Sequence, residues 1–89
     1  PGEDMLEIDE QTRNILAASA SVIENLENYN EKSLAEELYK VAQEQGMEPK
    51  DMFTLFYRIL IGREKGPRLA GFIITAGKEK VLPILKSYL

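Results

Sequence analysis

Apolar residues recur every three, four or seven positions along most of the chain, which is the spacing of one face of an α-helix. The first such stripe predicts an amphipathic helix over about 8–28, with Thr12 and Ser19 at small positions on its apolar face. Its apolar members are Ile8, Ile15, Leu16, Val22, Ile23 and Leu26. Asn28, Tyr29 and Asn30 then break the pattern.

A second helix is predicted over about 31–45, and its stripe consists of Leu34, Leu38 and Val41. Ser33 followed by Glu36 has the spacing of a capping box, although the helix could equally begin near Asn30. Gly46 follows the last apolar position, where glycine commonly ends a helix in the left-handed conformation.

The third predicted helix follows Pro49 and covers 50–61. Proline is favoured in the first turn because its fixed φ angle suits a helix and its missing N–H is not needed there. After the first turn, the polar residues are only Thr54 and Arg58. We therefore expect this helix to be central and covered on most sides, and to end at Gly62.

A fourth helix is predicted to begin at Pro67, again as a first-turn proline, and to run to Gly77. Gly71 inside it would cost about 1 kcal/mol relative to alanine. Close approach of another backbone is the expected reason for a glycine at that position.

The fifth predicted helix covers 78–88 and contains Pro83, which predicts either a kink or a late start near Glu79. No sustained period-two alternation indicates a strand. Five helices joined by short loops predict an all-α fold, a compact bundle of about five helices.

Length and composition predict one domain over 1–89. Apolar residues make up 44% of the chain, and no apolar run is long enough to span a bilayer, which favours a cytoplasmic protein. The chain has no cysteine and no histidine, so the common nucleophile, general-base and zinc arrangements are not available. Because it begins with Pro1, we expect a fragment of a longer protein.

Carboxylates one helical turn apart, for example Glu24 with Glu27 and Glu7 with Glu10, could hold a hard cation. Nothing else in the sequence converges on either pair, and glutamate is a good surface helix former. We therefore interpret both pairs as solvated helix faces and predict no metal site, no cofactor and no catalytic residue.

Charge is divided unevenly along the chain. Residues 1–51 contain 13 acidic and 4 basic residues, whereas residues 52–89 contain 2 acidic and 7 basic residues. The basic set consists of Arg58, Arg63, Lys65, Arg68, Lys78, Lys80 and Lys86. Such a cluster can attract nucleic acid even on an acidic protein. The alternative is that these cations complement helix C-termini and make an apolar bundle soluble.

Residues 62–69, GREKGPRL, place three cations, two glycines and a proline between apolar helices. If Gly66 is the N-cap of the fourth helix, the N–H groups of Arg68 and Leu69 lack a side-chain acceptor at the positive helix end. They could then receive a phosphate or a base, with Arg63 and Lys65 beside them. The alternative is a tight connector whose amide groups are hydrated.

An aromatic residue just before this segment could stack on an unpaired base. Phe56 is expected in the core, and Tyr57, which lies between core positions on the helical wheel, is the better candidate.

The stretch 49–85, PKDMFTLFYRILIGREKGPRLAGFIITAGKEKVLPIL, resembles the C-terminal end of class I lysyl-tRNA synthetases and, less closely, of class I glutamyl-tRNA synthetases. A Phe-rich helix leads into Leu-x-Gly and Gly-Pro-Arg-Leu, followed by a short apolar helix, Gly-Lys and a closing apolar helix. The likeness is strongest over 49–82 and weak over the first thirty residues. In that family this segment is an all-helical cage that receives the tRNA anticodon loop.

The resemblance implies roles for particular residues. It places Gly66, Pro67, Arg68 and Leu69 beside anticodon bases, with Arg63 and Lys65 near the RNA backbone.

Where the glutamyl branch commonly has an arginine, this chain has Tyr57 followed by Arg58, so either side chain could face a base. Ile61 replaces a threonine of that branch, and together with Arg68 it favours the lysyl branch.

The same resemblance implies a division of labour. The family's ATP-binding motifs, one of which needs histidine, are not in this chain, so we expect it to be inert alone and to belong to an ATP-dependent lysine–tRNA ligase. Its expected partners are a lysine-accepting tRNA and the catalytic domain of the parent chain, where ATP and magnesium would bind. The alternative function is a helical protein-interaction module with no role in RNA binding.

Overall fold

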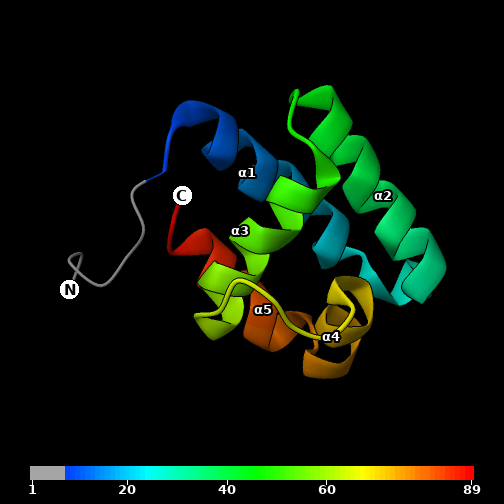
Figure 1. Ribbon diagram of the computed structural model, residues 1–89. Helices are drawn as coiled ribbons and strands as arrows, with labels where there is room; N and C mark the ends of the chain where they lie inside the picture. Colours follow the sequence, from blue (N-terminus) through cyan, green and yellow to red (C-terminus); the bar gives the residue numbers. More distant parts are fainter. Residues whose placement is uncertain (1–7) are drawn as a thin grey trace.

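The computed structural model describes residues 8–89, and the regular structure in this range is entirely helical (Figure 1). The predicted all-α fold of five helices is confirmed, with one additional 3₁₀ turn, η2. The elements are α1 (Glu10–Glu24), η2 (Leu26–Asn28), α2 (Glu31–Glu44), α3 (Pro49–Ile61), α4 (Leu69–Ala76) and α5 (Lys78–Lys86). None of these helices has both the length and the apolar character needed to cross a membrane.

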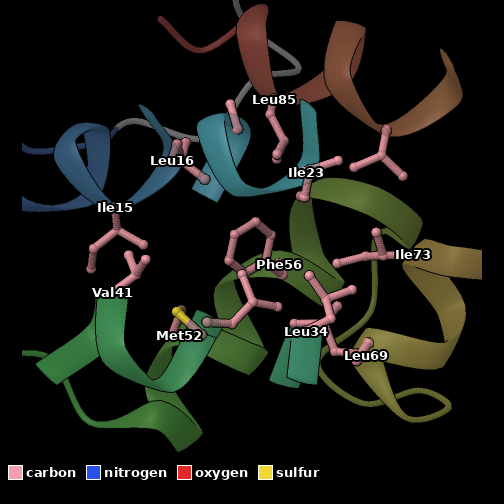
Figure 2. Close-up of a cluster of buried hydrophobic side chains, with 14 of the residues drawn as sticks. Ile15, Leu16, Ile23, Leu34, Val41, Met52, Phe56, Leu69, Ile73 and Leu85 are labelled. Carbon is pink, nitrogen blue, oxygen red and sulfur yellow. The ribbon is translucent and has the colours of Figure 1, made fainter. Parts of the chain in front are cut away.

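The apolar faces of the five helices meet in one core (Figure 2). Phe56 of α3 lies in the middle of it and is fully buried. Helix α3 packs against α2, α4 and α5, while α1 packs against α2 and α5. The expectation that α3 is central and covered on most sides is only partly confirmed, because α2, α4 and α5 also make their main contacts with three helices each, and only Met52, Phe56 and Ile59 of α3 are buried. The small positions Thr12 and Ser19 on α1 are buried as predicted.

Side-chain caps set the starts of the first two long helices. Asp9 accepts a hydrogen bond of 2.8 Å from the Thr12 N–H, so α1 begins at Glu10 rather than at residue 8. Asn30 and Ser33 form a reciprocal capping box at the start of α2, with distances of 2.8 and 2.9 Å. Of the two predicted alternatives, the start near Asn30 is confirmed and the box of Ser33 with Glu36 is wrong, because Ser33 is itself the third residue of the helix.

Helix ends follow the glycines. Gly46 and Gly62 adopt φ angles of 74° and 71°, the left-handed conformation that glycine adopts without a Cβ penalty. Met47 N–H donates to the Ala42 carbonyl at 2.9 Å, and Gly46 N–H donates to the Gln43 carbonyl, which together form a Schellman motif. Helix α1 differs, because it ends at Glu24 and continues into η2 instead of running to residue 28.

In the last two helices, one prediction is wrong and one of two alternatives is excluded. Helix α4 begins at Leu69 and not at Pro67, because Arg68 has an extended ψ angle of 125° and acts as the N-cap. The Arg68 carbonyl accepts the first helical bond, from Phe72 N–H at 2.8 Å. Helix α5 begins at Lys78 with Pro83 inside it, so of the two expected alternatives, a kink or a late start near Glu79, the late start does not occur.

Segment 62–68 crosses the molecule between the end of α3 and the start of α4 (Figure 1). Helix α4 packs against α2, so the start of α2 lies beside this crossing although it is more than thirty residues earlier in the chain. This packing places residues from α2, α3 and α4 around one groove.

Candidate functional site

Segment 62–68 is exposed along its whole length, and two contacts hold its two halves against α3. Arg58 forms an ion pair with Glu64 in the first half. The Tyr57 hydroxyl donates a hydrogen bond to the Pro67 carbonyl in the second half. In a helix beginning at Pro67, the carbonyls of Gly66 and Pro67 would be the first two acceptors, so Tyr57 bonds a carbonyl that the later start of α4 leaves free.

Of the two residues that could face a base, Tyr57 is the one that lines a groove. Its neighbour Arg58 is turned toward Glu64 and does not line it. The Tyr57 hydroxyl is protonated at neutral pH and can donate, and burial raises its pKa further above the ordinary tyrosine value.

Gly66 lies directly on the Tyr57 ring. A Cβ atom at this position would be 3.0 Å from Ile61 Cδ1 and 3.1 Å from Tyr57 Cδ1, closer than most real Cβ contacts. Glycine is therefore needed here for a close approach and not for a left-handed backbone, since its φ angle is not positive.

We predict that Gly66→Ala lowers the free energy of unfolding by about 1 kcal/mol, because the new methyl group must displace the hydrogen-bonded Tyr57 ring. Urea denaturation measures the change. In a Tyr57→Ala background the same substitution should cost clearly less, because the ring is gone. An equal cost in both backgrounds would contradict this explanation of Gly66.

The groove has a volume of about 760 Å³ and lies between α2, α3 and the start of α4. Its lining from α2 is Glu31, Lys32, Ala35, Leu38 and Tyr39; from α3, Phe53 and Tyr57; and from the third wall, Gly66, Arg68, Leu69 and Ala70. The Tyr39 and Phe53 rings are 5.4 Å apart between centroids and are tilted by 48°. The groove therefore offers aromatic surface with cations at its border.

The structure brings Tyr57, Gly66, Arg68 and Leu69 of the predicted site together on this groove. Leu69 is only 4% exposed, so most of its side chain belongs to the core.

The other predicted residues lie around the groove. Pro67 lines a second, shallower hollow beside it, and Arg63 and Lys65 are exposed on the crossing segment. Neither Arg63 nor Lys65 forms an ion pair with any other residue in 8–89.

Sequence reasoning missed the wall of the groove that α2 provides and one aromatic residue of α3. The missed residues are Glu31, Lys32, Tyr39 and Phe53, of which the last belongs to α3. Tyr39 is 39% exposed, which is unusual for a large aromatic residue in a helix of this bundle. The periodicity of α2 shows which residues leave the core, but not which neighbouring helix they face.

The free backbone N–H groups at the start of α4 begin one residue later than predicted, at Leu69 and not at Arg68. With Arg68 as N-cap, the first helical residue is Leu69, and no side chain accepts a hydrogen bond in the cap. The Glu31 carboxylate lies beside the first turn of α4, where a Cβ atom at Gly71 would be 3.3 Å from Glu31 Cδ. The expected reason for Gly71, close approach of another backbone, is therefore wrong, and a side chain of α2 makes the approach.

Most of the predicted basic cluster is paired with acids. Besides the Arg58 pair, Arg68 Nη1 lies 3.4 Å from Glu31 Oε1, Lys78 Nζ lies 2.8 Å from Glu27 Oε1, and Lys86 Nζ lies 3.5 Å from Glu24 Oε1. The unpaired basic charge in this half of the described chain is thus on Arg63, Lys65 and Lys80.

Glu24 and Glu27, one of the two carboxylate pairs considered for a cation, contact lysines of α5. The hydrogen bond from Lys78 lowers the pKa of the Glu27 carboxyl group. In the other pair, Glu7 lies outside the described residues. Over 8–89, no three carboxylates are grouped so that they could hold a metal ion.

Comparison with known proteins gives a family. The sequence model of a family described as an anticodon binding domain matches residues 3–89. The lysine–tRNA ligase of Thermoplasma acidophilum is 33% identical over 81 residues, covering 91% of this chain and 16% of the relative. That of Borrelia garinii subsp. bavariensis is 39% identical over 69 residues, covering 78% of this chain and 13% of the relative.

The chain thus spans only a small part of the length of these relatives, between 13% and 16%. The family match, by contrast, covers nearly the whole chain, including every helix described above. This protein belongs to the anticodon binding domain family.

Proposed function

We propose that the domain binds the anticodon loop of a lysine-accepting tRNA, as the C-terminal part of a class I lysine–tRNA ligase. The observation that carries the proposal is the groove, where Tyr39, Phe53 and Tyr57 provide aromatic surface beside Lys32 and Arg68. Proteins that recognise single-stranded RNA stack unpaired bases on aromatic side chains and contact the backbone with cations. The family and the similarity to lysine–tRNA ligases support the same assignment.

The groove and the crossing segment would have different roles in this binding. The groove has a volume of about 760 Å³, which is within the usual range for sites that enclose a small ligand, so an unstacked nucleotide can enter it. Gly66, Pro67, Arg68 and Leu69 would lie beside bases at its edge. Arg63 and Lys65, exposed and unpaired within 8–89, would contact phosphates. Arg58 would hold the segment in place through Glu64.

The domain would select and position tRNA without performing chemistry. Binding the anticodon loop would place the acceptor end of the correct tRNA in the catalytic part of the parent chain. Holding the reacting groups in the right geometry in this way lowers the entropic part of the barrier. ATP and magnesium would bind in that catalytic part and not here. The parent ligase and its tRNA would work together in the cytoplasm.

Titration with anticodon stem-loops tests this proposal. A labelled stem-loop with a lysine anticodon should bind saturably, and a loop with a changed anticodon should bind more weakly. Both affinities should fall as salt rises, with a slope of roughly 0.7 per phosphate contact when log affinity is plotted against log salt. Equal binding of the two loops, or no saturable binding, would instead favour a protein-interaction module.

A further inference from the structure

Glu31 stands at the border of the groove, and this residue is the subject of an inference that rests on the proposed function. Glu31 and Arg68 line both the groove and the second hollow, so their ion pair forms the wall between the two. Any base that enters the groove from the crossing segment would therefore meet a carboxylate beside a guanidinium group.

The position of Glu31 is built into the fold. Its carboxyl group lies so close to Gly71 that a side chain there would contact it, and the capped first turn of α2 holds its backbone. The side chain is still 49% exposed, and that of Arg68 is 90% exposed. Since exposed ion pairs contribute little to stability, both groups can exchange this contact for a ligand at small cost.

A carboxylate here would weaken binding to a phosphate, because the two charges repel. It can, however, accept a hydrogen bond from a base N–H, while the guanidinium group can only donate. Uracil presents an N–H at ring position N3 between two carbonyl oxygens, which matches an acceptor beside a donor. A cytosine stacked in the same position turns an unprotonated N3 toward the carboxylate, which repels it. To donate its N4–H to Glu31 instead, the cytosine must shift along its edge and leave the position in which uracil stacks.

Lysine codons are AAA and AAG, so the second and third letters of every lysine anticodon are uracil. We propose that one of these two uracils stacks on the aromatic surface of the groove, donates its N3–H to Glu31 and accepts a hydrogen bond from Arg68. Glu31 is then a specificity-determining residue. It provides discrimination between bases and not overall affinity.

Glu31→Gln tests the assignment because the amide keeps the shape of the side chain, removes the charge and adds a donor. The probes are three lysine anticodon stem-loops: the matched loop, and two loops in which cytidine replaces the second or the third anticodon uridine. Wild-type protein should bind one of the two cytidine loops at least about ten-fold more weakly than the matched loop, the discrimination typical of a bidentate base contact.

In Glu31→Gln, that difference should shrink to about two-fold, because an amide can satisfy either N3 group. Affinity for the matched loop should stay the same or rise, since a negative charge has left the RNA-binding surface. Glu36→Gln is the matched control. It makes the same charge change on the same helix at an exposed position outside the groove, and it should keep the wild-type discrimination.

The possible failures are distinguishable. If wild-type protein discriminates but Glu31→Gln discriminates equally well, the role of Glu31 is refuted while anticodon binding stands. If Glu36→Gln relaxes discrimination as much as Glu31→Gln, the effect is one of net charge, and the assignment is again overturned. If wild-type protein binds none of the three loops, the proposed function itself fails, and this inference fails with it.

Discussion

Phe56→Ala is expected to lower the free energy of unfolding by about 3–5 kcal/mol, a large part of the stability of a domain this size. Phe56 is fully buried, and it lies where the side chains of the other helices converge (Figure 2). Removing its ring leaves a cavity that five short helices cannot close without separating their other contacts. Urea denaturation followed by circular dichroism at 222 nm would measure the loss, since the regular structure in 8–89 is helical.

Phe72→Ala provides the matched comparison for this prediction. The same atoms are removed from α4, where the ring is partly exposed beside the second hollow. The cost should be about 1 kcal/mol, because little buried surface is lost. Similar losses in the two variants would mean that the core is not centred on Phe56.

The second large effect is expected on RNA binding. Replacing Arg63, Lys65 and Arg68 together by alanine should weaken binding of the lysine anticodon stem-loop by roughly 10- to 100-fold near physiological salt. Two lost phosphate contacts, those of Arg63 and Lys65, should also reduce the slope of log affinity against log salt by about 1.4, while the loss of Arg68 removes a base contact. Fluorescence anisotropy at several salt concentrations measures both quantities. Thermal melts should show a folded protein, since all three side chains lie on the exposed segment and its end.

The control for this variant removes the same amount of charge elsewhere. Arg13, Lys50 and Lys80 are exposed, form no ion pair within 8–89 and do not line the groove. Their triple alanine variant should lose far less affinity. If the two triple variants weaken binding equally, the RNA responds to the overall charge of the domain and not to a site on segment 62–68.

The fold could be predicted because each helix carries its own signals. The apolar stripe of the first helix, including the small residues Thr12 and Ser19, identifies the buried face correctly. Gly46 and Gly62 end helices in the left-handed conformation, as their positions after an apolar stripe indicate. These features depend on neighbours within one or two turns, so they can be seen in the sequence alone.

The start of α4 could not be predicted in the same way. Pro67 fits the first turn of a helix in isolation, but its carbonyl is bonded by a tyrosine hydroxyl ten residues earlier, and the helix begins after Arg68. The preference of proline for the first turn of a helix is thus overridden by a contact between residues far apart in the sequence. Similarly, Gly71 is explained only by the carboxylate of Glu31, which arrives from another helix.

The sequence predicted only one of the two walls of the groove, the segment between α3 and α4. The segment between α3 and α4 is conspicuous in the sequence because its charge and glycines interrupt apolar helices. The opposite wall of the groove, with Lys32 and Tyr39, comes from α2 and depends on the packing of that helix against α4. The distribution of charge along the chain was also a poor guide to the site, since acidic residues of α1, η2 and α2 pair with several of the late cations.

The central claim is that the anticodon loop binds at the groove and segment 62–68. Titrating ¹⁵N-labelled domain with a lysine anticodon stem-loop, and following the backbone amide signals by NMR, tests it residue by residue. We expect the largest saturable shifts at Lys32, Tyr39, Gly66, Arg68 and Gly71, with little change along α1 and α5. The largest shifts instead around Lys78 and Lys86, or no saturable shifts at all, would contradict the account.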